Sequence, residues 1–351
     1  MKTAKLPKDL AIIGAGSWGT ALAAHAARQG IGVTLWARKA ELADQINNLH
    51  ENPAFLPGLR LPGGIKAHSE LAEVLKGRKV VLLVVPSHIV REMARNMAPH
   101  LEPGSVIISA SKGIEDETSA TMVQILEEEL PAKHGLEYGA VSGPSFAKEV
   151  AMGLPTAVTL AMRSKALARE VQTFLSAPTF RIYTSLDVVG VELGGALKNV
   201  YAIATGICDG FSLGHNARAA MLPRALGEMT RMAVALGANP MTLMGLSGMG
   251  DLILTATGDL SRNRNVGLRL GAGEKLADIM AGSREVAEGV RNAKSIRNMA
   301  LRYKVDMPMA REVYRVLYEN KEPRQGMVDL LTRRLKDELD PRYQDMGAVH
   351  L

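Results

Sequence analysis

Residues Leu10 to Gly19 read Leu-Ala-Ile-Ile-Gly-Ala-Gly-Ser-Trp-Gly, and they indicate the fold of the first half of the chain. The first four residues form an uncharged apolar run, which is typical of a strand buried on both faces of a parallel sheet. The last six have the pattern G-x-G-x-x-G, and Thr20–Gln29 behind them has the length and composition of a helix. We therefore predict a strand, a glycine turn and a helix in succession.

The glycines of this turn predict a dinucleotide-binding site. Gly14 permits the tight turn, Gly16 lets the backbone approach a pyrophosphate, and Gly19 lets the helix pack on the strand. The N–H groups and the positive dipole end at the start of the helix attract the anion. The predicted cofactor-binding residues of the turn are Gly14, Gly16, Ser17, Trp18 and Gly19.

The end of the next predicted strand, Val33–Trp36, indicates which dinucleotide is preferred. An acidic residue about 20 residues beyond the glycine turn would hold the ribose 2′-hydroxyl of NAD. Here Arg38 and Lys39 stand in place of that acid. Because a guanidinium pairs well with phosphate oxygens, we predict that Arg38 contacts the 2′-phosphate of NADP(H), with NAD(H) as the alternative cofactor. Two solvated cations at a strand end are the other interpretation.

Apolar runs alternate with helical patterns up to about residue 190. Beyond those already named, the predicted elements are the helix Ala40–Leu49 and the strands Val80–Val85, Ser105–Ser109, Thr156–Ala161 and Phe180–Thr184. This alternation predicts an α/β fold with a mostly parallel, doubly wound sheet. We expect a Rossmann-like NAD(P)-binding domain over residues 1–190.

The composition changes after residue 190, where Ala, Leu, Met and Arg dominate and favour helices. From Glu192 onward, apolar residues recur at the spacing of a buried helical stripe. The uncharged window Met232–Gly250 contains glycines and Pro240, so we interpret it as a helix end and a loop rather than a membrane span. We predict an all-α substrate-binding and catalytic domain over residues 191–351, joined directly to the first.

Charge and composition narrow the classes of function. The 351 residues carry a net charge of +6, but no block of five or six like charges occurs and aromatics are only 4%, so a nucleic-acid partner is not expected. The single cysteine, Cys208, fits a reducing compartment and predicts a cytoplasmic protein. Asp9 and the glycines of the turn argue against a secretory signal. The histidines lack metal-ligand spacing, so no metal is expected.

Several short motifs in one order resemble the bacterial-type NAD(P)-dependent glycerol-3-phosphate dehydrogenases. They are Gly14–Gly19, Val85-Pro86-Ser87, Ser111-Lys112-Gly113-Ile114-Glu115, Gly143-Pro144-Ser145-Phe146-Ala147, Leu197-Lys198-Asn199, Asp251-Leu252 with Thr255, Ser261-Arg262-Asn263 and Glu288-Gly289. The resemblance covers about residues 10–290. It implies reversible hydride transfer between NAD(P)H and C2 of dihydroxyacetone phosphate, a small phosphorylated triose, supplying glycerophospholipid synthesis.

The resemblance also assigns the site. It implies that Lys198 is the catalytic acid and base and that Arg262 clamps the substrate phosphate, which a guanidinium fork fits. The implied substrate-binding residues are Lys112, Gly143, Ser145, Lys198, Asn199, Asp251, Thr255, Ser261, Arg262 and Asn263. The further implied cofactor-binding residues are Lys112, Ala147, Arg262, Val286 and Glu288. On a helical wheel, Lys198 lies away from the apolar stripe, beside small residues that leave room for another domain or a ligand.

Other interpretations stay open at this point. A related two-domain reductase, such as a 3-hydroxyacid or 6-phosphogluconate dehydrogenase, also joins a Rossmann domain to a helical domain with a catalytic lysine; Ser261-Arg262-Asn263 argues against it. A non-catalytic NADP sensor and a basic nucleic-acid-binding protein are the other classes. A helical second domain with apolar stripes makes a homodimer the expected oligomer.

Overall fold

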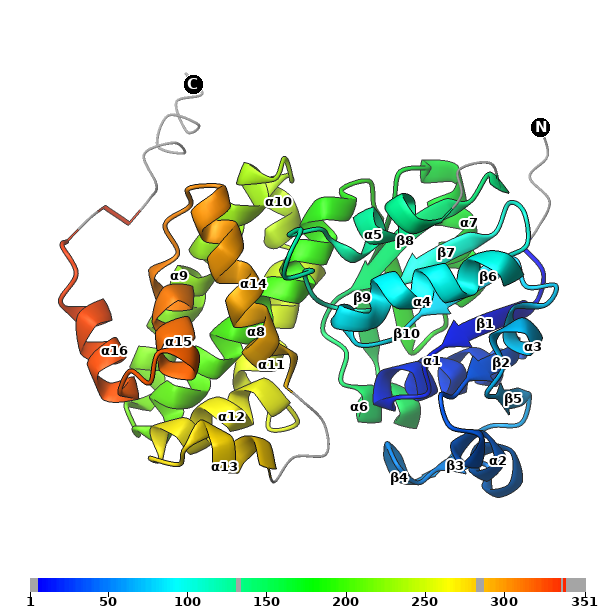
Figure 1. Ribbon diagram of the computed structural model, residues 1–351, viewed down its shortest axis with the longest axis horizontal. Helices are drawn as coiled ribbons and strands as arrows, with labels where there is room; N and C mark the ends of the chain where they lie inside the picture. Colours follow the sequence, from blue (N-terminus) through cyan, green and yellow to red (C-terminus); the bar gives the residue numbers. More distant parts are fainter. Residues whose placement is uncertain (1–5, 131–133, 282–286, 336, 339–351) are drawn as a thin grey trace.

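One mixed sheet forms the core of the N-terminal half of the chain. The structure, a computed structural model, describes residues 6–130, 134–281, 287–335, 337 and 338 (Figure 1). An eight-stranded sheet has the order β10-β9-β8-β7-β6-β1-β2-β5, and all neighbours are parallel except β8 and β9. Its strands are β1 (Asp9–Ile13), β2 (Gly32–Trp36), β5 (Ile65–His68), β6 (Val80–Leu83), β7 (Val106–Ser109), β8 (Glu137–Ser142), β9 (Thr156–Met162) and β10 (Phe180–Ser185). A separate antiparallel pair consists of β3 (Glu51–Asn52) and β4 (Leu56–Arg60).

Helices cover both faces of this sheet, which explains why whole strands are apolar. In β1, Leu10 and Ile12 pack into the core with α1, α2, α6 and α7, whereas Ala11 and Ile13 pack into the core with α3, α4 and α5. These helices are α1 (Ser17–Arg28), α2 (Ala40–Leu49), α3 (Leu71–Leu75), α4 (Val90–Met97), α5 (Met122–Glu129), α6 (Ala147–Met152) and α7 (Lys165–Leu175). The predicted mostly parallel, doubly wound sheet is therefore confirmed. We call residues 9–185 the sheet region.

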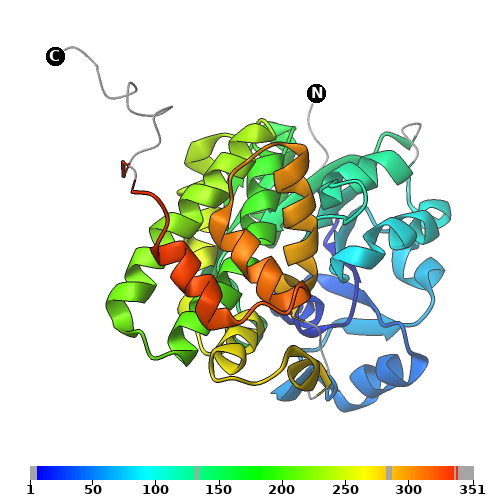
Figure 2. The same cartoon turned by 60° about the vertical axis from the view of Figure 1, so that its left-hand side comes forward.

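The second half of the chain is helical and lies to one side of the sheet (Figures 1 and 2). Its central helix is α8 (Val188–Gly210), which is buried from Gly190 to Cys208 and contacts α9, α11, α12, α14 and α15. The other helices are α9 (Gly214–Ala235), α10 (Pro240–Leu243), α11 (Asp251–Thr257), α12 (Arg262–Gly271), α13 (Leu276–Ala281), α14 (Glu288–Arg302), α15 (Pro308–Tyr318) and α16 (Pro323–Leu331). We call residues 188–331 the helical region. No helix within the described part of the chain is long and apolar enough to cross a membrane.

The predicted elements differ from the observed ones in several places. The strands β3, β4, β5 and β8 were not predicted, and the predicted strand Val80–Val85 ends at Leu83. Where a loop was expected before Gly250, the chain forms the short helix α10 and a π-helical turn, Leu246–Gly250. The predicted boundary between residues 190 and 191 falls inside the first turn of α8. The division into two domains stays a prediction.

Candidate active site at the junction of the two regions

A buried lysine marks the junction between the sheet and helical regions. Lys198 lies in the middle of α8 and is only 6% exposed. An ammonium removed from water is costly unless it is paired. Its Nζ donates to Asp251 Oδ1 and, at 2.8 Å, to Thr255 Oγ1. The side chain is therefore held by two groups of α11, which are four residues apart and share one face of that helix.

The carboxylate of Asp251 joins the two regions. Asp251 is fully buried, and its second oxygen accepts from Lys112 Nζ at 2.7 Å. Lys112 follows β7 in the sheet region, and it also donates to the carbonyl of Gly143 at 3.2 Å. One buried carboxylate thus lies between two ammonium groups that come from different halves of the chain. We call Lys112, Lys198, Asp251 and Thr255 the lysine–aspartate cluster.

The protonation of Lys198 is set by opposing effects. Burial lowers its pKa from the ordinary value of 10.5 to about 7, and the neighbouring charge of Lys112 acts in the same direction. The carboxylate of Asp251 raises the pKa and only partly offsets burial. A lysine that titrates near neutral pH can both donate and accept a proton under ordinary conditions.

Glycines explain why this cluster forms. A Cβ on Gly194 would lie 2.4 Å from the carbonyl oxygen of Ser247, so the π-helical turn packs directly on the backbone of α8. Lys198 is four residues beyond Gly194 on the same face of α8, and Asp251 follows the turn directly. On the neighbouring side, a Cβ on Gly195 would lie 2.4 Å from Ser142 Oγ of the sheet region. The small residues predicted to give room beside Lys198 therefore admit both partners.

Next to the cluster, the turn after β8 brings Gly143, Ser145 and Ala147 to the junction. Gly143 has a φ of +149°, and a Cβ there would lie 2.9 Å from the Cα of Val158, so only glycine fits. Its carbonyl accepts from Lys112 and, at 2.9 Å, from the hydroxyl of Ser145. Ala147 is the first residue of α6 and is half-buried.

Two asparagines connect the starts of α12 and α14 to α8. The amide of Asn263 donates to Asn199 Oδ1 at 2.9 Å and accepts from the backbone N–H of Gly289 at 2.8 Å. Asn199 directly follows Lys198, so this chain of hydrogen bonds fixes two helix starts beside the cluster. Ser261 caps α12 by accepting from the N–H of Arg264, and Arg262, the first residue of α12, has an exposed side chain.

The glycine turn has the geometry that a pyrophosphate site needs. A Cβ on Gly14 would lie 2.3 Å from the carbonyl oxygen of Val84, and one on Gly19 would lie 1.8 Å from that of Gly14. Gly16, in contrast, has open space where a Cβ would be and caps α1 without a side-chain acceptor. The indole N–H of Trp18 is buried without a partner among the described residues. These observations fit a dinucleotide whose phosphates approach Gly16 and the start of α1.

The remaining predicted cofactor contacts lie on both sides of this turn. Gly14 N donates to the carbonyl of Trp36 at 3.2 Å, so the exposed Arg38, two residues farther along, lies just beyond the turn. Across the junction, the half-buried Glu288 accepts from the hydroxyl of Ser87 at 3.1 Å. Burial raises the pKa of Glu288, partly offset by Ser87, Arg291 and Arg262. Val286 lies outside the described residues.

Two residues of the junction were not assigned a role from the sequence. Ser87 belongs to the motif Val85-Pro86-Ser87, but only its hydrogen bond to Glu288 shows that it connects the sheet region to the helical region. Asn292 is buried on α14 and donates to the carbonyl of Ala196 at 3.1 Å, one turn from the start of that helix. A buried asparagine carries no distinguishing pattern in the sequence. Across the described ranges, no group of three or more His, Cys, Asp or Glu side chains could hold a metal ion.

Comparisons with known proteins agree with this arrangement. The chain matches the family models for the N-terminus and C-terminus of NAD-dependent glycerol-3-phosphate dehydrogenase over residues 9–168 and 187–328. It is 50% identical over 333 residues to a glycerol-3-phosphate dehydrogenase [NAD(P)+] of Geobacter sulfurreducens, covering 95% of this chain and 99% of the relative.

Solved structures show the same relationship. The crystal structure of the Coxiella burnetii glycerol-3-phosphate dehydrogenase has a TM-score of 0.89 at 38% identity, with 93% of this chain and all (100%) of that chain covered. The Saccharomyces cerevisiae glycerol-3-phosphate dehydrogenase has a TM-score of 0.80 at 25% identity, with the same coverage of 93% and 100%. The resemblance found in the motifs is confirmed, and the chain belongs to the NAD-dependent glycerol-3-phosphate dehydrogenase family.

Proposed function

We propose that this enzyme catalyses the reversible NAD(P)H-dependent reduction of dihydroxyacetone phosphate to sn-glycerol 3-phosphate, with Lys198 as the general acid and base. The observation that carries the proposal is the buried lysine–aspartate cluster, in which Lys198 has a pKa near 7 and faces the junction between the regions. Asp251 and Thr255 hold the amine in place, and Lys112 adds a second positive charge beside the same carboxylate.

The proton moves through Lys198 in both directions of the reaction. In reduction, the ammonium of Lys198 donates a proton to the oxygen at C2 as that carbon becomes an alcohol. The reduced nicotinamide, when bound, would supply the hydride for C2. In oxidation, the neutral amine of Lys198 takes the hydroxyl proton. The ammonium charge is balanced by Asp251, so the proton is held beside a carboxylate and out of bulk water.

Arg262 and the neighbouring helix starts bind the phosphate of the substrate in this proposal. The guanidinium fork matches two phosphate oxygens, and the dipole at the start of α12 adds to its attraction. The hydrogen bonds of Ser261, Asn199 and Asn263 described above fix the start of α12, where Arg262 is the first residue. Gly143 and Ser145 complete the substrate site from the sheet region.

The dinucleotide binds across the glycine turn in this proposal. Gly14, Gly16, Ser17, Trp18 and Gly19 hold its pyrophosphate, Arg38 holds the 2′-phosphate, and Lys112, Ala147, Arg262 and Glu288 line the nicotinamide end. The preference for NADP(H) over NAD(H) is part of the proposal. So are a homodimer, a cytoplasmic location and the supply of glycerol 3-phosphate to glycerophospholipid synthesis.

A single assay separates this proposal from its rivals. The purified protein should oxidise NADPH only when dihydroxyacetone phosphate is added. It should not reduce NADP+ when 3-hydroxyacids or 6-phosphogluconate are supplied. The product should be sn-glycerol 3-phosphate, identified with a second, stereospecific enzyme. NADPH binding without turnover on dihydroxyacetone phosphate would instead identify a sensor or a reductase with another substrate.

A further inference from the structure

The segment that carries Lys112 continues as a bridge between the two regions. We propose that Arg91 and Glu115 are positioning residues for the reaction: their ion-pair cluster holds residues 113–119, which we call the brace, and so keeps Lys112 against Asp251. This inference rests on the proposed function and deepens it, because neither side chain is among the substrate or cofactor contacts proposed above.

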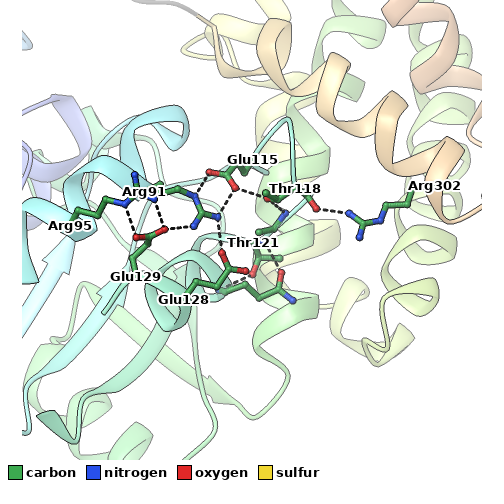
Figure 3. Close-up of polar contacts among 10 residues, drawn as sticks. Arg91, Arg95, Glu115, Thr118, Thr121, Glu128, Glu129 and Arg302 are labelled. Carbon is green, nitrogen blue, oxygen red and sulfur yellow. Dashed lines mark hydrogen bonds and ion pairs between the residues drawn. The ribbon is translucent and has the colours of Figure 1, made fainter. Parts of the chain in front are cut away.

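In the sheet region, ion pairs connect the brace to Arg91 of α4 and, through Arg91, to α5. Arg91 on α4 makes a two-pronged pair with Glu115, at 2.8 and 2.7 Å, and also pairs with Glu128, at 2.7 Å, and with Glu129 (Figure 3). The hydroxyl of Thr118 donates to the same carboxylate of Glu115. The side chains of Arg91 and Glu115 are 22% and 20% exposed, so the pair is only partly screened by water.

On the other side, the brace is tied to α14 of the helical region. Lys294 pairs with Asp116 at 2.8 Å, and Asn298 donates to the same carboxylate at 3.2 Å. Arg302 donates to the backbone carbonyl of Thr118 at 2.6 Å, a contact that crosses between the regions in Figure 3. The brace is therefore held by α4 at Glu115 and by α14 at Asp116 and Thr118.

The start of the brace has little freedom to move. Ile114 is 3% exposed and packs into the core of the helical region, although it follows a strand of the sheet region. A Cβ on Gly113 would lie 2.4 Å from the Cβ of Ser87, so the backbone there is in close contact with the neighbouring loop. Lys112 is directly before these two residues. A displacement of Glu115 would therefore reach Lys112 through a short, tightly packed stretch of chain.

The position of Lys112 matters because of what its charge does to Lys198. The charged groups facing Lys198 are Asp251 of α11 and Lys112, and Lys112 helps to lower the pKa of Lys198. If Lys112 moves away, the pKa of Lys198 rises. Oxidation of glycerol 3-phosphate needs the neutral amine of Lys198. The rise of kcat/KM for this oxidation with pH therefore moves to higher pH. Direct loss of a nearby carboxylate charge would have the opposite effect, since a negative charge raises the pKa of an ammonium.

Glu115→Gln tests the inference in the full-length enzyme. We expect kcat for glycerol 3-phosphate oxidation to fall about tenfold, because small misplacements of catalytic groups cost one to two orders of magnitude. We also expect the alkaline-rising limb of kcat/KM to move up by about half a pH unit or more, with Kd for NADPH unchanged. Arg91→Lys, which keeps the charge but loses the fork, should give a smaller change in the same direction.

Arg163→Gln is the matched control, because Arg163 pairs with Glu127 of α5 outside the brace. It should leave both kcat and the pH limb unchanged. The inference is overturned if Glu115→Gln has the wild-type kcat and pH limb, or if kcat falls while the limb stays or moves down. If Glu115→Gln does not fold, Arg91→Lys decides by the same criteria. A wild-type enzyme that does not oxidise NADPH with dihydroxyacetone phosphate would refute the proposed function instead, and this inference with it.

Discussion

Lys198 shows how a single side chain acquires chemistry from its surroundings. An exposed lysine is almost always protonated near pH 7, whereas this one is buried between two helices and has a pKa of about 7. Its partner, Asp251, prevents the pKa from falling farther, and the second lysine, Lys112, opposes that effect. The three residues therefore act as a unit, and changing any of them changes the proton affinity of Lys198.

The pH dependence of the two directions follows from this pKa. Below about pH 7, Lys198 is an ammonium and can donate a proton, so kcat/KM for dihydroxyacetone phosphate reduction should be highest there and fall as the pH rises through 7. Above it, the neutral amine can accept a proton, so kcat/KM for glycerol 3-phosphate oxidation should rise through the same pH. Initial rates in both directions between pH 5.5 and 9 check this, within about one pH unit.

Asp251→Asn provides the internal check on that profile. Removal of the carboxylate removes the effect that raises the pKa of Lys198, so the limb for oxidation should move to lower pH even though kcat falls. If the rate of oxidation rises at the same pH in Asp251→Asn as in the wild type, a group other than Lys198 is responsible for that rise.

Arg38 determines the cofactor preference if it contacts the 2′-phosphate. Arg38→Asp should raise KM for NADPH by about tenfold or more, since a charge-assisted pair is replaced by repulsion, while KM for NADH changes little. Steady-state rates with both cofactors measure the effect. Lys76→Asp is the control, because it makes the same charge change at an exposed site in the same region. Equal changes for both cofactors in Arg38→Asp would refute the assignment.

The sequence alone predicts less about the site residues than the family resemblance does. A helical wheel places Lys198 off the apolar stripe, where lysines are usually solvated, yet the whole central part of α8 is buried because other helices surround it. The pairing of Lys198 with Asp251 spans 53 residues and that of Lys112 with Asp251 spans 139. A pattern within one helix or strand cannot link residues that lie so far apart in the sequence. Only the order of the motifs shared with the family relates these residues to one another.

Two glycines of the glycine turn have different physical roles. A Cβ on Gly16 would meet open space, and the φ of −73° at this position suits any residue, so Gly16→Ala should fold normally. The added methyl group should, however, occupy space that the proposal gives to the pyrophosphate. A Cβ on Gly19 would lie 1.8 Å from a backbone oxygen, so Gly19→Ala should push α1 off its strand and cost about 1–3 kcal/mol of unfolding free energy.

Calorimetry and cofactor titration distinguish the two variants. Gly16→Ala should keep the wild-type Tm and bind NADPH at least about tenfold more weakly, whereas Gly19→Ala should lose both stability and binding. If Gly16→Ala binds NADPH as tightly as the wild type, the pyrophosphate does not approach this turn.

The packing of α8 on α12 gives a second prediction for an element. A Cβ on Gly206 would lie 2.1 Å from the carbonyl oxygen of Arg264, so the two helix backbones are in direct contact. Gly206→Ala should lower the unfolding free energy by about 1–3 kcal/mol and, because α12 begins at Arg262, raise KM for dihydroxyacetone phosphate. Gly227→Ala, whose Cβ would lie 3.6 Å from the nearest atom, Arg231 Nη1, should instead stabilise by about 0.5–1 kcal/mol. Chemical denaturation and steady-state rates measure both.

The sequence predicts elements well where they are apolar and less well where they are short or polar. Strands such as β1, β2 and β9 were predicted to within about two residues because their cores consist of apolar residues and threonine and carry no charge. The unpredicted strands of the main sheet are Ile65–His68, with polar residues at alternate positions, and Glu137–Ser142, which contains Gly139. A Cβ on Gly139 would lie 2.7 Å from Met162, so that glycine reflects the close neighbouring strand, which the sequence does not reveal.

The candidate site belongs to neither half of the chain alone. The sheet region contributes Lys112 and the turn at Gly143, and the helical region contributes Lys198 and Asp251. The net charge of +6 is consistent with a junction that gathers cations around anionic ligands. Many of the remaining arginines pair with nearby carboxylates, as Arg91 does with three glutamates.

Replacement of Lys198 by alanine tests whether this residue carries the proton of the reaction. In Lys198→Ala, kcat for dihydroxyacetone phosphate reduction should fall by about 10²–10⁴, the usual contribution of a general acid. Kd for NADPH, measured by fluorescence titration, should stay within about twofold of the wild type because the glycine turn lies on the other region. Turnover within a few-fold of the wild type would show that the buried lysine does not carry the proton.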